Sequence, residues 1–360
     1  MNLIVFIMLL FSLLGFIDKM FQLNIGLSDA FDKGLKTMGT MSISLIGICS
    51  VGVAFISQHI NFFTHISSSL PIDASLIISA LLAPDMGGYS ISEQLASQSE
   101  LIIFNGVILT SLLGQTMSFQ FPVFLSAIDS KEHSTLMKGF IVGIIMIPFG
   151  LIIAQICLQL SLSLFLSQFI PIFIICIIIA GGLLLFPKQL IKGFTLFACG
   201  IQWLTYVLFL IAVIGVFFPT IAYAPIDLVK DSILIVLKST IIVCGSLVLS
   251  ELILKYLHPV LLKISKWLHI NEISVMGLIL SCATSLAILP LFSKMDHKGK
   301  LLNAAFAVSG AYFIGGQLGY IATVTTSSAV TVYILSKIVC GLMSICIMSL
   351  IFEKTKNKSF

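Results

Sequence analysis

Eleven long apolar stretches constrain the fold of this chain more than any other feature. About 20 apolar residues suffice for one membrane-spanning helix, and a helix satisfies its own backbone hydrogen bonds inside lipid. The alternation of apolar and polar residues that is typical of a membrane β-barrel is absent from the sequence. The stretches run approximately over residues 1–17, 38–60, 70–84, 101–128, 137–160, 164–186, 190–218, 232–256, 273–293, 301–322 and 326–352.

The composition supports a membrane protein. Of the 360 residues 58% are hydrophobic and 9% are charged, whereas a soluble domain carries about 25% charged residues. We therefore predict an all-α polytopic membrane protein with about 9–11 transmembrane helices. Residues 1–352 form one transmembrane domain, and residues 353–360 form a short lysine-rich cytoplasmic tail. The first stretch lacks a basic start and a small-residue cleavage site, which favours a retained helix over a removed signal peptide.

Lysine positions predict the topology, because lysines favour the cytoplasmic side of a membrane. If all eleven stretches cross the membrane, the lysine groups at 131–138, 188–192 and 255–266 lie on the outer side. If 101–128 and 273–293 are instead re-entrant hairpins, all six lysine groups lie on the cytoplasmic side and nine spans remain. The alternative is that these two stretches are ordinary kinked helices. The groups are 19, 33 and 36; 131 and 138; 188 and 192; 255, 263 and 266; 294, 298 and 300; and 354, 356 and 358.

Several classes of function have no support in the sequence. No lysine-rich run alternates with aromatic residues, so nucleic-acid binding is not indicated. The eight cysteines are scattered singly, which predicts neither a metal site nor a disulfide framework. Nucleotide-binding loops and nucleophile motifs are also absent, so we expect no cofactor and no catalytic residues.

Residues 83–94 close an apolar run with a proline and a glycine pair, which favours a broken helix. An acid at membrane depth is a functional candidate. A carboxylate and a tyrosine ring together suit an ammonium group, and Tyr89 and Glu93 share a face if a helix resumes after Gly88. A helix end at the membrane surface, capped by Asp85, is the alternative. The candidate substrate-binding residues here are Asp85, Met86, Gly87, Gly88, Tyr89 and Glu93.

A second glycine-rich break lies at residues 314–320 and also ends in Gly-Tyr. The lysine pattern makes the two interrupted segments run in opposite directions, which indicates a weak inverted repeat with a binding site between its halves. Close packing through small residues is the alternative for these glycines. Other candidates lie near the tips of the proposed hairpins. The substrate-binding candidates from these regions are Gln115, Thr284, Ser285, Gly315, Gly316 and Gln317.

Several segments resemble the ethanolamine utilisation transporter family. They are LAPDMGGY at 82–89, KMDHKGKLLNAAFAVS at 294–309, residues 271–277, GQLGY at 316–320 and Ile-Asp at 17–18. The resemblance covers most of the chain and implies uptake of ethanolamine, by facilitated diffusion or driven by a gradient, across a bacterial inner membrane. It also implies a small-molecule substrate, contact with lipid and a possible homo-oligomer.

The sequence departs from the family pattern at two places. The family has an acid and a histidine at the positions of Gly316 and Gln317, and an asparagine pair at those of Thr284 and Ser285. The second break therefore lacks a carboxylate, which leaves Asp85 as the expected counter-ion. A permease for another small amine or polar metabolite, and a membrane sensor or assembly partner that does not transport, remain the alternatives.

Overall fold

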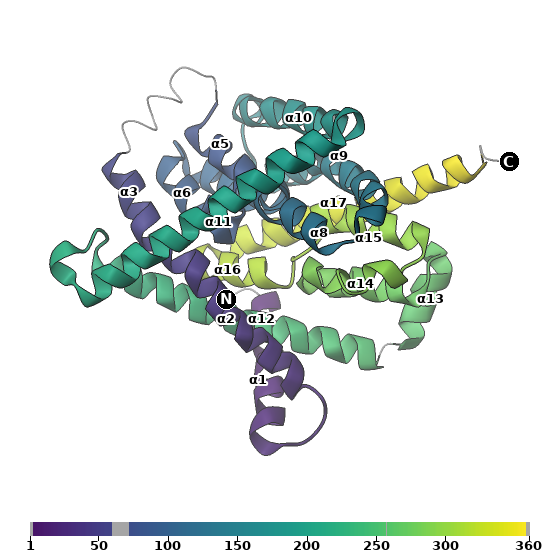
Figure 1. Cartoon of the computed structure of the whole chain (residues 1–360), viewed down its shortest axis with the longest axis horizontal. Coiled ribbons are helices and arrows are strands. Elements are labelled where there is room, and N and C mark those ends of the chain that lie inside the picture. Colours follow the sequence, from purple (N-terminus) through teal and green to yellow (C-terminus); the bar gives the residue numbers. More distant parts are fainter. Residues whose placement is uncertain (1–2, 60–71, 257, 358–360) are drawn as a thin grey trace.

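The structure, a computed structural model, describes residues 3–59, 72–256 and 258–357, which are helical with no strand among them (Figure 1). Six helical segments of this part are long and apolar enough to cross a membrane. They are Ser28–Gln58, Ser99–Leu125, Ser130–Leu158, Leu162–Gly182, Ile226–Tyr256 and Ser327–Lys354. The predicted all-α polytopic class is therefore confirmed.

Three further segments are predicted crossings. They are α1 (Leu3–Phe21), α11 (Pro187–Phe217) and the interrupted pair α15 (His297–Ser309) and α16 (Gly316–Val324). That these three also cross stays a prediction, because the described residues contain six segments of membrane length. The six are built from α2 (Ser28–Gly47), η1 (Ile48–Gly52), α3 (Val53–Gln58), α7 (Ser99–Leu101), η3 (Ile102–Gly114), η4 (Thr116–Gln120), α8 (Phe121–Ala127), η5 (Ser130–Glu132), α9 (His133–Leu158), α10 (Leu162–Leu185), α12 (Ile226–Tyr256) and α17 (Ser327–Asn357).

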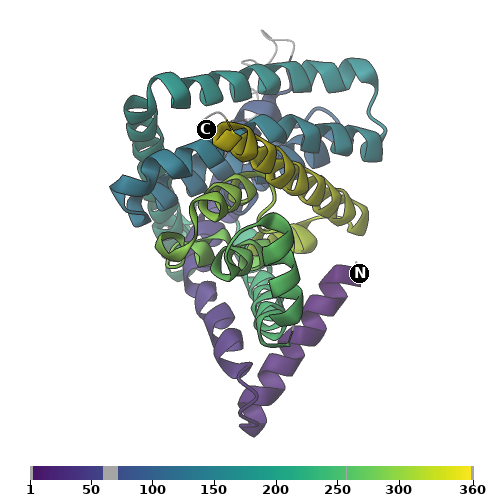
Figure 2. The same ribbon diagram turned by 90° about the vertical axis from the view of Figure 1, so that its right-hand side faces the viewer.

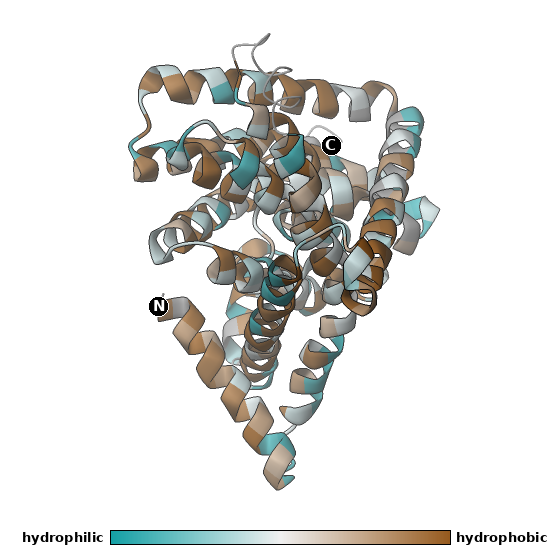
Figure 3. Cartoon of the chain, turned by 90° about the vertical axis from the view of Figure 1, so that its left-hand side faces the viewer, coloured by the Kyte–Doolittle hydropathy of each residue, from teal (hydrophilic) through white to brown (hydrophobic). Residues whose placement is uncertain are grey.

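Large apolar side chains are exposed along the outer helices, whose ribbons are largely coloured as hydrophobic in Figure 3. On α10, Ile177 and Ile178 are 55% and 64% exposed, and Leu13 and Leu14 of α1 are also exposed. Apolar patches of this extent are not stable in water, and lipid covers them without cost. Figure 2 shows α1 and α2 joined at one end as a V, and both helices pack on α12.

Residues 271–296, hereafter hairpin B, form a re-entrant hairpin, as predicted for 273–293. They contain α14 (Glu272–Ala283), η7 (Ser285–Ile288) and η8 (Phe292–Lys294). The two ends are tied together, because the Asn271 backbone N–H donates to Asp296 Oδ1 at 2.9 Å and Asn271 Nδ2 donates to the Lys294 carbonyl at 3.0 Å. The chain therefore enters and leaves on one side.

Residues 73–97, hereafter hairpin A, form a second hairpin where we predicted a span over 70–84. It contains α5 (Ala74–Leu81), η2 (Pro84–Met86) and α6 (Gly88–Leu95). Its ends are also tied, since the Ser97 N–H donates to Asp73 Oδ2 at 2.9 Å. The predicted span was wrong because the break at Pro84–Met86 reverses the chain. Residues 70 and 71 of that prediction lie outside the described residues.

The prediction of a hairpin over 101–128 was also wrong. Residues 99–127 are helical throughout, and most of them have π-helical hydrogen bonds. The polar Gly114-Gln115-Thr116 stretch widens this helix locally without reversing it. The number of hairpins was right, but the sequence analysis assigned one of them to the neighbouring segment.

The bases of the two hairpins lie at opposite ends of α9. The helix after hairpin B is tied to the start of α9 by an ion pair between Lys300 and Glu132. Hairpin A lies near the start of α10, which follows the end of α9, because Asn105 Nδ2 donates to Ser75 Oγ at 2.9 Å and to Gln168 Oε1 at 3.3 Å. Each hairpin is followed by a long helical segment, residues 99–127 and 297–324. This arrangement is an inverted repeat, but its pairing differs from the predicted one. The sequence analysis matched the break at 83–94 with the break at 314–320, whereas hairpin A corresponds to hairpin B and residues 99–127 correspond to residues 297–324.

Lysines gather at the end of the molecule that holds the base of hairpin B. Lys298 pairs with Glu353 at 3.5 Å, which brings the end of α17 there. Lys255 Nζ donates to the Ile25 carbonyl at 2.7 Å, which joins the end of α12 to the α1–α2 turn. The remaining described elements are connectors, η6 (Pro219–Ile221) and α13 (His258–Leu268). The cytoplasmic tail stays a prediction; α17 continues to Asn357, and residues 358–360 lie outside the described residues.

Candidate functional site

The tip of hairpin A holds Asp85 on an unwound turn. After α5 the chain is extended at Leu82 and Ala83, and Pro84 then starts one turn of 3-10 helix. Gly87 has φ +93°, a conformation that glycine adopts without strain. The Gly88 N–H closes the turn by donating to the Ala83 carbonyl at 2.9 Å. This local geometry projects Asp85 from an irregular backbone.

The first arms of the two hairpins are too short to cross a membrane. The eight residues of α5 span about 12 Å and the twelve of α14 about 18 Å at 1.5 Å per residue, against a hydrocarbon thickness of about 30 Å. Irregular backbone inside a membrane needs protein partners for its polar groups. For hairpin A, Ser118 Oγ of η4 accepts from the Ala83 N–H at 3.0 Å.

Hairpin B is supported by the break between α15 and α16. The Tyr312 N–H donates to the Ser281 carbonyl at 3.0 Å, and the Ile314 N–H donates to the Cys282 carbonyl at 3.1 Å. A Cβ atom on Gly315 would lie 1.6 Å from the Ala283 carbonyl oxygen. The break therefore lets the chain lie directly against the end of α14.

Glycine has the same role beside hairpin A. A Cβ on Gly114 would lie 2.1 Å from the Leu82 carbonyl oxygen. Gly114 in the helix after hairpin A and Gly315 in the helix after hairpin B thus occupy equivalent places. This equivalence is independent structural evidence for the inverted repeat.

Polar side chains from both halves meet around the tips in what we name the central polar cluster. Ser285 Oγ donates to Tyr312 Oη at 3.0 Å, and Tyr333 Oη donates to the Tyr312 carbonyl at 2.9 Å. Gln317 Oε1 lies 3.4 Å from Tyr333 Oη. The cluster consists of Asp85, Gln115, Ser285, Tyr312, Gln317, Tyr333 and Lys337.

Asp85 supplies the negative charge of the central polar cluster. It lies within electrostatic range of Lys337, Tyr312 and Tyr333. Among the described residues, no lysine or histidine nitrogen lies within 4.0 Å of its carboxylate. Its charge is therefore not neutralised by direct contact, and a small cation at the tip of hairpin A would meet an available carboxylate.

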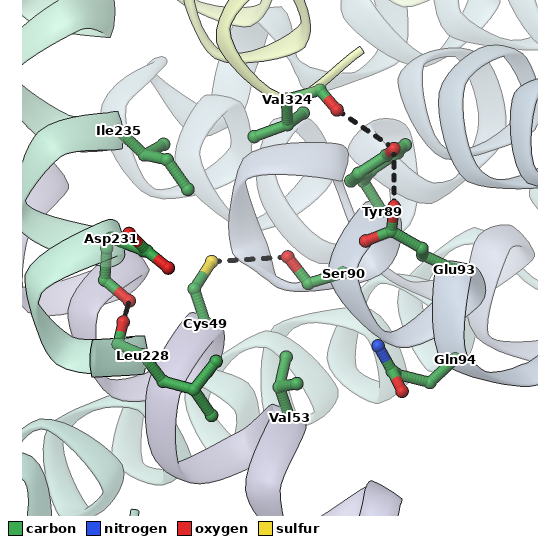
Figure 4. Close-up of a pocket in the computed structure, with 11 residues that line it drawn as sticks. Cys49, Val53, Tyr89, Ser90, Glu93, Gln94, Leu228, Asp231, Ile235 and Val324 are labelled. Carbon is green, nitrogen blue, oxygen red and sulfur yellow. Dashed lines mark hydrogen bonds between the residues drawn. The ribbon is translucent and has the colours of Figure 1, made fainter. Parts of the chain in front are cut away.

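A cavity of about 180 Å³ opens beside α6 on the hairpin A side, and we name it the Glu93 pocket (Figure 4). Tyr89 Oη lies 3.1 Å from both Glu93 Oε1 and the Val324 carbonyl, so it links α6 to the end of α16. This volume is enough for several water molecules or a small solute. The pocket is lined by Cys49, Val53, Tyr89, Ser90, Glu93, Gln94, Leu228, Asp231, Ser232, Ile235 and Val324.

The Glu93 pocket attracts cations. It has two carboxylates, Glu93 and Asp231, and no basic residue in its lining, so its local potential raises the concentration of positive solutes. Tyr320 lies behind it, with its ring 6.3 Å from that of Tyr89 and its hydroxyl 2.9 Å from Ser90 Oγ. The Cys49 thiol lies 3.3 Å from Ser90 Oγ and 3.9 Å from Tyr320 Oη. Cys49, Tyr89, Ser90 and Tyr320 thus form a continuous layer beside the pocket.

The structure divides the predicted site residues into groups. Ser285 and Gln317 are joined through Tyr312 and Tyr333, Gln115 is bonded to Lys337, and Asp85 lies within electrostatic range of Lys337 and both tyrosines. The other predicted residues lie outside this cluster. Tyr89 and Glu93 share a face of α6 and line the Glu93 pocket, and Met86, Gly87 and Gly88 form the turn of hairpin A. Thr284 is the extended residue before η7, and Gly315 packs on α14, whereas a Cβ on Gly316 would lie 3.8 Å from its nearest neighbour and so has room.

Lys337 is the charged residue of the central polar cluster that sequence reasoning missed. It belongs to none of the lysine groups on which the topology prediction rests. It is nevertheless the one charged residue in the apolar stretch 326–352, and an ionisable side chain inside a membrane span is a functional candidate. Tyr333 lies one turn before it, on the same face of α17. Asp231 gave no such signal, because it lies at the edge of an apolar stretch.

Comparison with known proteins identifies the family. The sequence model described as "Ethanolamine utilisation protein, EutH" matches residues 1–351. This chain belongs to the EutH family. It is 30% identical over 356 residues to the "Probable ethanolamine permease EutH" of Listeria monocytogenes, covering 96% of this chain and 92% of the relative. The protein of the same name from Salmonella typhimurium is 25% identical over 391 residues, covering 98% and 96%.

A Bacillus subtilis protein described as uncharacterized, YxeR, is 27% identical over 319 residues, which cover 89% of this chain and 86% of that protein. No solved structure matches the chain. Membership of a permease family makes this chain a multi-pass membrane transporter rather than an enzyme. The described residues hold no group of three or more His, Cys, Asp or Glu side chains that could bind a metal ion.

Proposed function

We propose that this chain carries protonated ethanolamine across a bacterial cytoplasmic membrane in the direction of uptake, as a facilitated or gradient-driven permease. The observation that carries the proposal is the carboxylate of Asp85, which stands on the unwound tip of hairpin A and has no directly paired cation among the described residues. The named relatives support ethanolamine as the substrate, since two of them are called probable ethanolamine permeases.

Protonated ethanolamine has an ammonium group and a hydroxyl group joined by two carbons. Its charge prevents free passage, because an isolated cation is too costly to transfer into hydrocarbon. Asp85 supplies the counter-charge, and charge-assisted hydrogen bonds to a carboxylate are the strong ones. The hydroxyls of Ser285 and Tyr312, from the other half of the repeat, are suited to the substrate hydroxyl.

The inverted repeat provides a route to alternating access. The tips of hairpins A and B meet the same cluster, while their bases lie at opposite ends of the molecule. Movement of one tip opens the cluster to one side, and movement of the other opens it to the opposite side. The Glu93 pocket lies on the hairpin A side, away from the lysine-rich end, and collects cations there before they pass the layer of Tyr89 and Tyr320.

The test is uptake of radiolabelled ethanolamine into liposomes that contain the purified protein. The variant Asp85→Asn keeps the shape of the side chain and removes its charge. We expect uptake to fall by at least about thirtyfold, since loss of one member of a buried charge interaction costs about 2–5 kcal/mol. Asp227→Asn is the matched control, because Asp227 is exposed and pairs only with Lys230 among the described residues. Equal uptake by wild type and Asp85→Asn would refute the proposal.

A different small amine on the same scaffold is the second candidate. It is favoured by the tip of hairpin B and the neighbouring break, where Thr284, Ser285, Gly316 and Gln317 provide no carboxylate. Competition of ethanolamine uptake by a series of small amines separates the two candidates. An amine that competes at least about tenfold better than ethanolamine would make it the preferred substrate.

A further inference from the structure

Lys337 lies at the centre of the protein without a direct partner of opposite charge. Its side chain is 0% exposed and is among the largest fully buried side chains of the described residues. Nζ donates to Gln115 Oε1, a neutral acceptor, at 3.2 Å. In the part of the chain that the structure describes, no carboxylate lies within 4.0 Å of this nitrogen. A buried ammonium is costly unless charge balances it.

Lys337 lies beside the tip of hairpin A, which carries Asp85. Its partner Gln115 follows Gly114, and a Cβ on Gly114 would lie 2.1 Å from the Leu82 carbonyl oxygen at that tip. The Asp85 and Lys337 side chains interact electrostatically without a contact within 4.0 Å. They come from opposite halves of the molecule, Asp85 from hairpin A and Lys337 from α17, and α17 contacts the η3 segment that carries the chain towards Gln115. The neighbours of Lys337 on its own helix are hydrogen-bonded elsewhere: Cys340 Sγ donates to the Met146 carbonyl at 3.0 Å and Tyr333 donates to Tyr312.

The chemistry of Lys337 matches that of the proposed substrate. A lysine side chain ends in a methylene group and an ammonium, and protonated ethanolamine ends in the same group. The lysine is tethered and the substrate is free, but both are attracted to the one carboxylate of the cluster. Two ammonium groups around one carboxylate also repel each other, by an amount that is large where water is excluded.

We propose that Lys337 is a built-in competitor of the substrate ammonium, which balances Asp85 in the empty site and weakens substrate binding enough to permit release. This inference rests on the proposed function and assigns a role to Lys337, a residue that the proposed function does not use. Without substrate, Asp85 and Lys337 together carry no net charge. With substrate bound, the site carries one positive charge. The lysine nitrogen donates to Gln115 and forms no ion pair with Asp85, which leaves the carboxylate accessible.

The proposal predicts opposite effects at the two charged residues. Removal of Asp85 weakens binding, whereas removal of the Lys337 charge strengthens it. In Lys337→Gln the loaded site becomes neutral, so the substrate is held more tightly. The empty site then carries a negative charge in a low-dielectric environment, so its return step slows. Affinity therefore rises while the maximal rate of uptake falls, a combination that a merely structural lysine would not produce.

The experiment is equilibrium binding of radiolabelled ethanolamine to purified protein in detergent, together with uptake into liposomes. We expect Lys337→Gln to bind at least about tenfold more tightly than wild type, with a lower maximal uptake rate. Lys337→Arg keeps the charge and should bind within about threefold of wild type. Lys230→Gln, at an exposed lysine of α12, is the control for loss of a surface lysine.

Lys337→Met has an unbranched side chain of similar length, so it provides a second neutral variant if Lys337→Gln does not fold. Folding is checked by gel filtration and thermal unfolding. A folded neutral variant that binds ethanolamine with unchanged or weaker affinity overturns the proposal. Asp85→Asn in the same assay separates the role of Asp85 from the role of Lys337. If Asp85→Asn loses ethanolamine binding and the Lys337 variants bind as wild type does, the proposed function stands and the proposed role of Lys337 is wrong.

Discussion

Hairpins A and B are built alike but are not chemically alike. Each begins with a capped helix, extends for one or two residues, turns through a 3-10 segment and returns to its own base. Each is followed by a helix whose glycine lies against the carbonyl that ends the first arm. Asp85 stands at the tip of hairpin A, and Ser285 has the corresponding place in hairpin B.

The difference indicates how a symmetric scaffold can bind an asymmetric solute. A carboxylate from one half suits the ammonium end, and a hydroxyl from the other half suits the hydroxyl end. The return arms also differ, because α6 is a regular helix whose Tyr89 and Glu93 line a pocket, whereas the return arm of hairpin B is made of turns. Architecture is thus shared between the halves, and the charge is not.

The architecture shared by the two halves is tested by substitution of Gly315, the glycine beside hairpin B, where we expect the largest effect on stability. We expect Gly315→Ala to destabilise the protein by about 1–3 kcal/mol, because its Cβ would lie 1.6 Å from the Ala283 carbonyl oxygen. Thermal unfolding in detergent measures the effect. Gly316→Ala is the matched control, since its nearest neighbour would be Val243 Cγ2 at 3.8 Å. Equal stability of the two variants would contradict the close approach of the break to α14.

The base of hairpin A should have a smaller effect on stability. Asp73 caps α5 by accepting from the Ser75 N–H at 3.0 Å and also holds the Ser97 N–H. Asp73→Ala should cost about 0.5–2 kcal/mol, and Asp73→Asn less, because the amide keeps one acceptor oxygen. Thermal unfolding and ethanolamine affinity are measured on the same samples. A large loss of affinity with normal stability would mean that Asp73 binds substrate directly.

The smallest expected effect is at the tip of hairpin B. Ser285→Ala removes one hydroxyl that donates to Tyr312, and a neutral hydrogen bond contributes about 0.5–1.5 kcal/mol. We expect ethanolamine affinity to fall by about two- to tenfold, far less than in Asp85→Asn. Ser281→Ala, at a buried hydroxyl on the same hairpin, is the comparison. A loss at Ser285 as large as the loss at Asp85 would remove the distinction between the two tips.

The sequence predicted the architecture better than the place of each reversal. Lysine positions and apolar length were enough for the all-α polytopic class and for the hairpin over 273–293, because both reflect contact with lipid and membrane orientation. They did not distinguish the break at Pro84, which reverses the chain, from the stretch at Gly114, which does not. That outcome depends on tertiary contacts such as those of Asp73 with Ser97, which no local pattern reveals.

Only part of the candidate site could be predicted, because the rest of it also depends on tertiary contacts. Asp85 and Gln317 stand at glycine-rich breaks and were visible in the sequence. Tyr312 and Tyr333 enter the cluster through contacts between distant segments. Lys337 was visible as a charged residue in an apolar stretch, but it lies outside the lysine groups that the topology argument used. Charged residues that a lysine count leaves unexplained are therefore themselves candidates for a site.

The central claim is that the Asp85 carboxylate recognises the positive charge of the substrate. Its most direct test compares the binding of ethanolamine with that of ethylene glycol, in which a neutral hydroxyl replaces the ammonium, to purified wild type and Asp85→Asn. We predict that wild type prefers ethanolamine by at least about thirtyfold and that the variant loses most of this preference. An equal preference in both proteins would show that the charge is recognised elsewhere and would contradict the account.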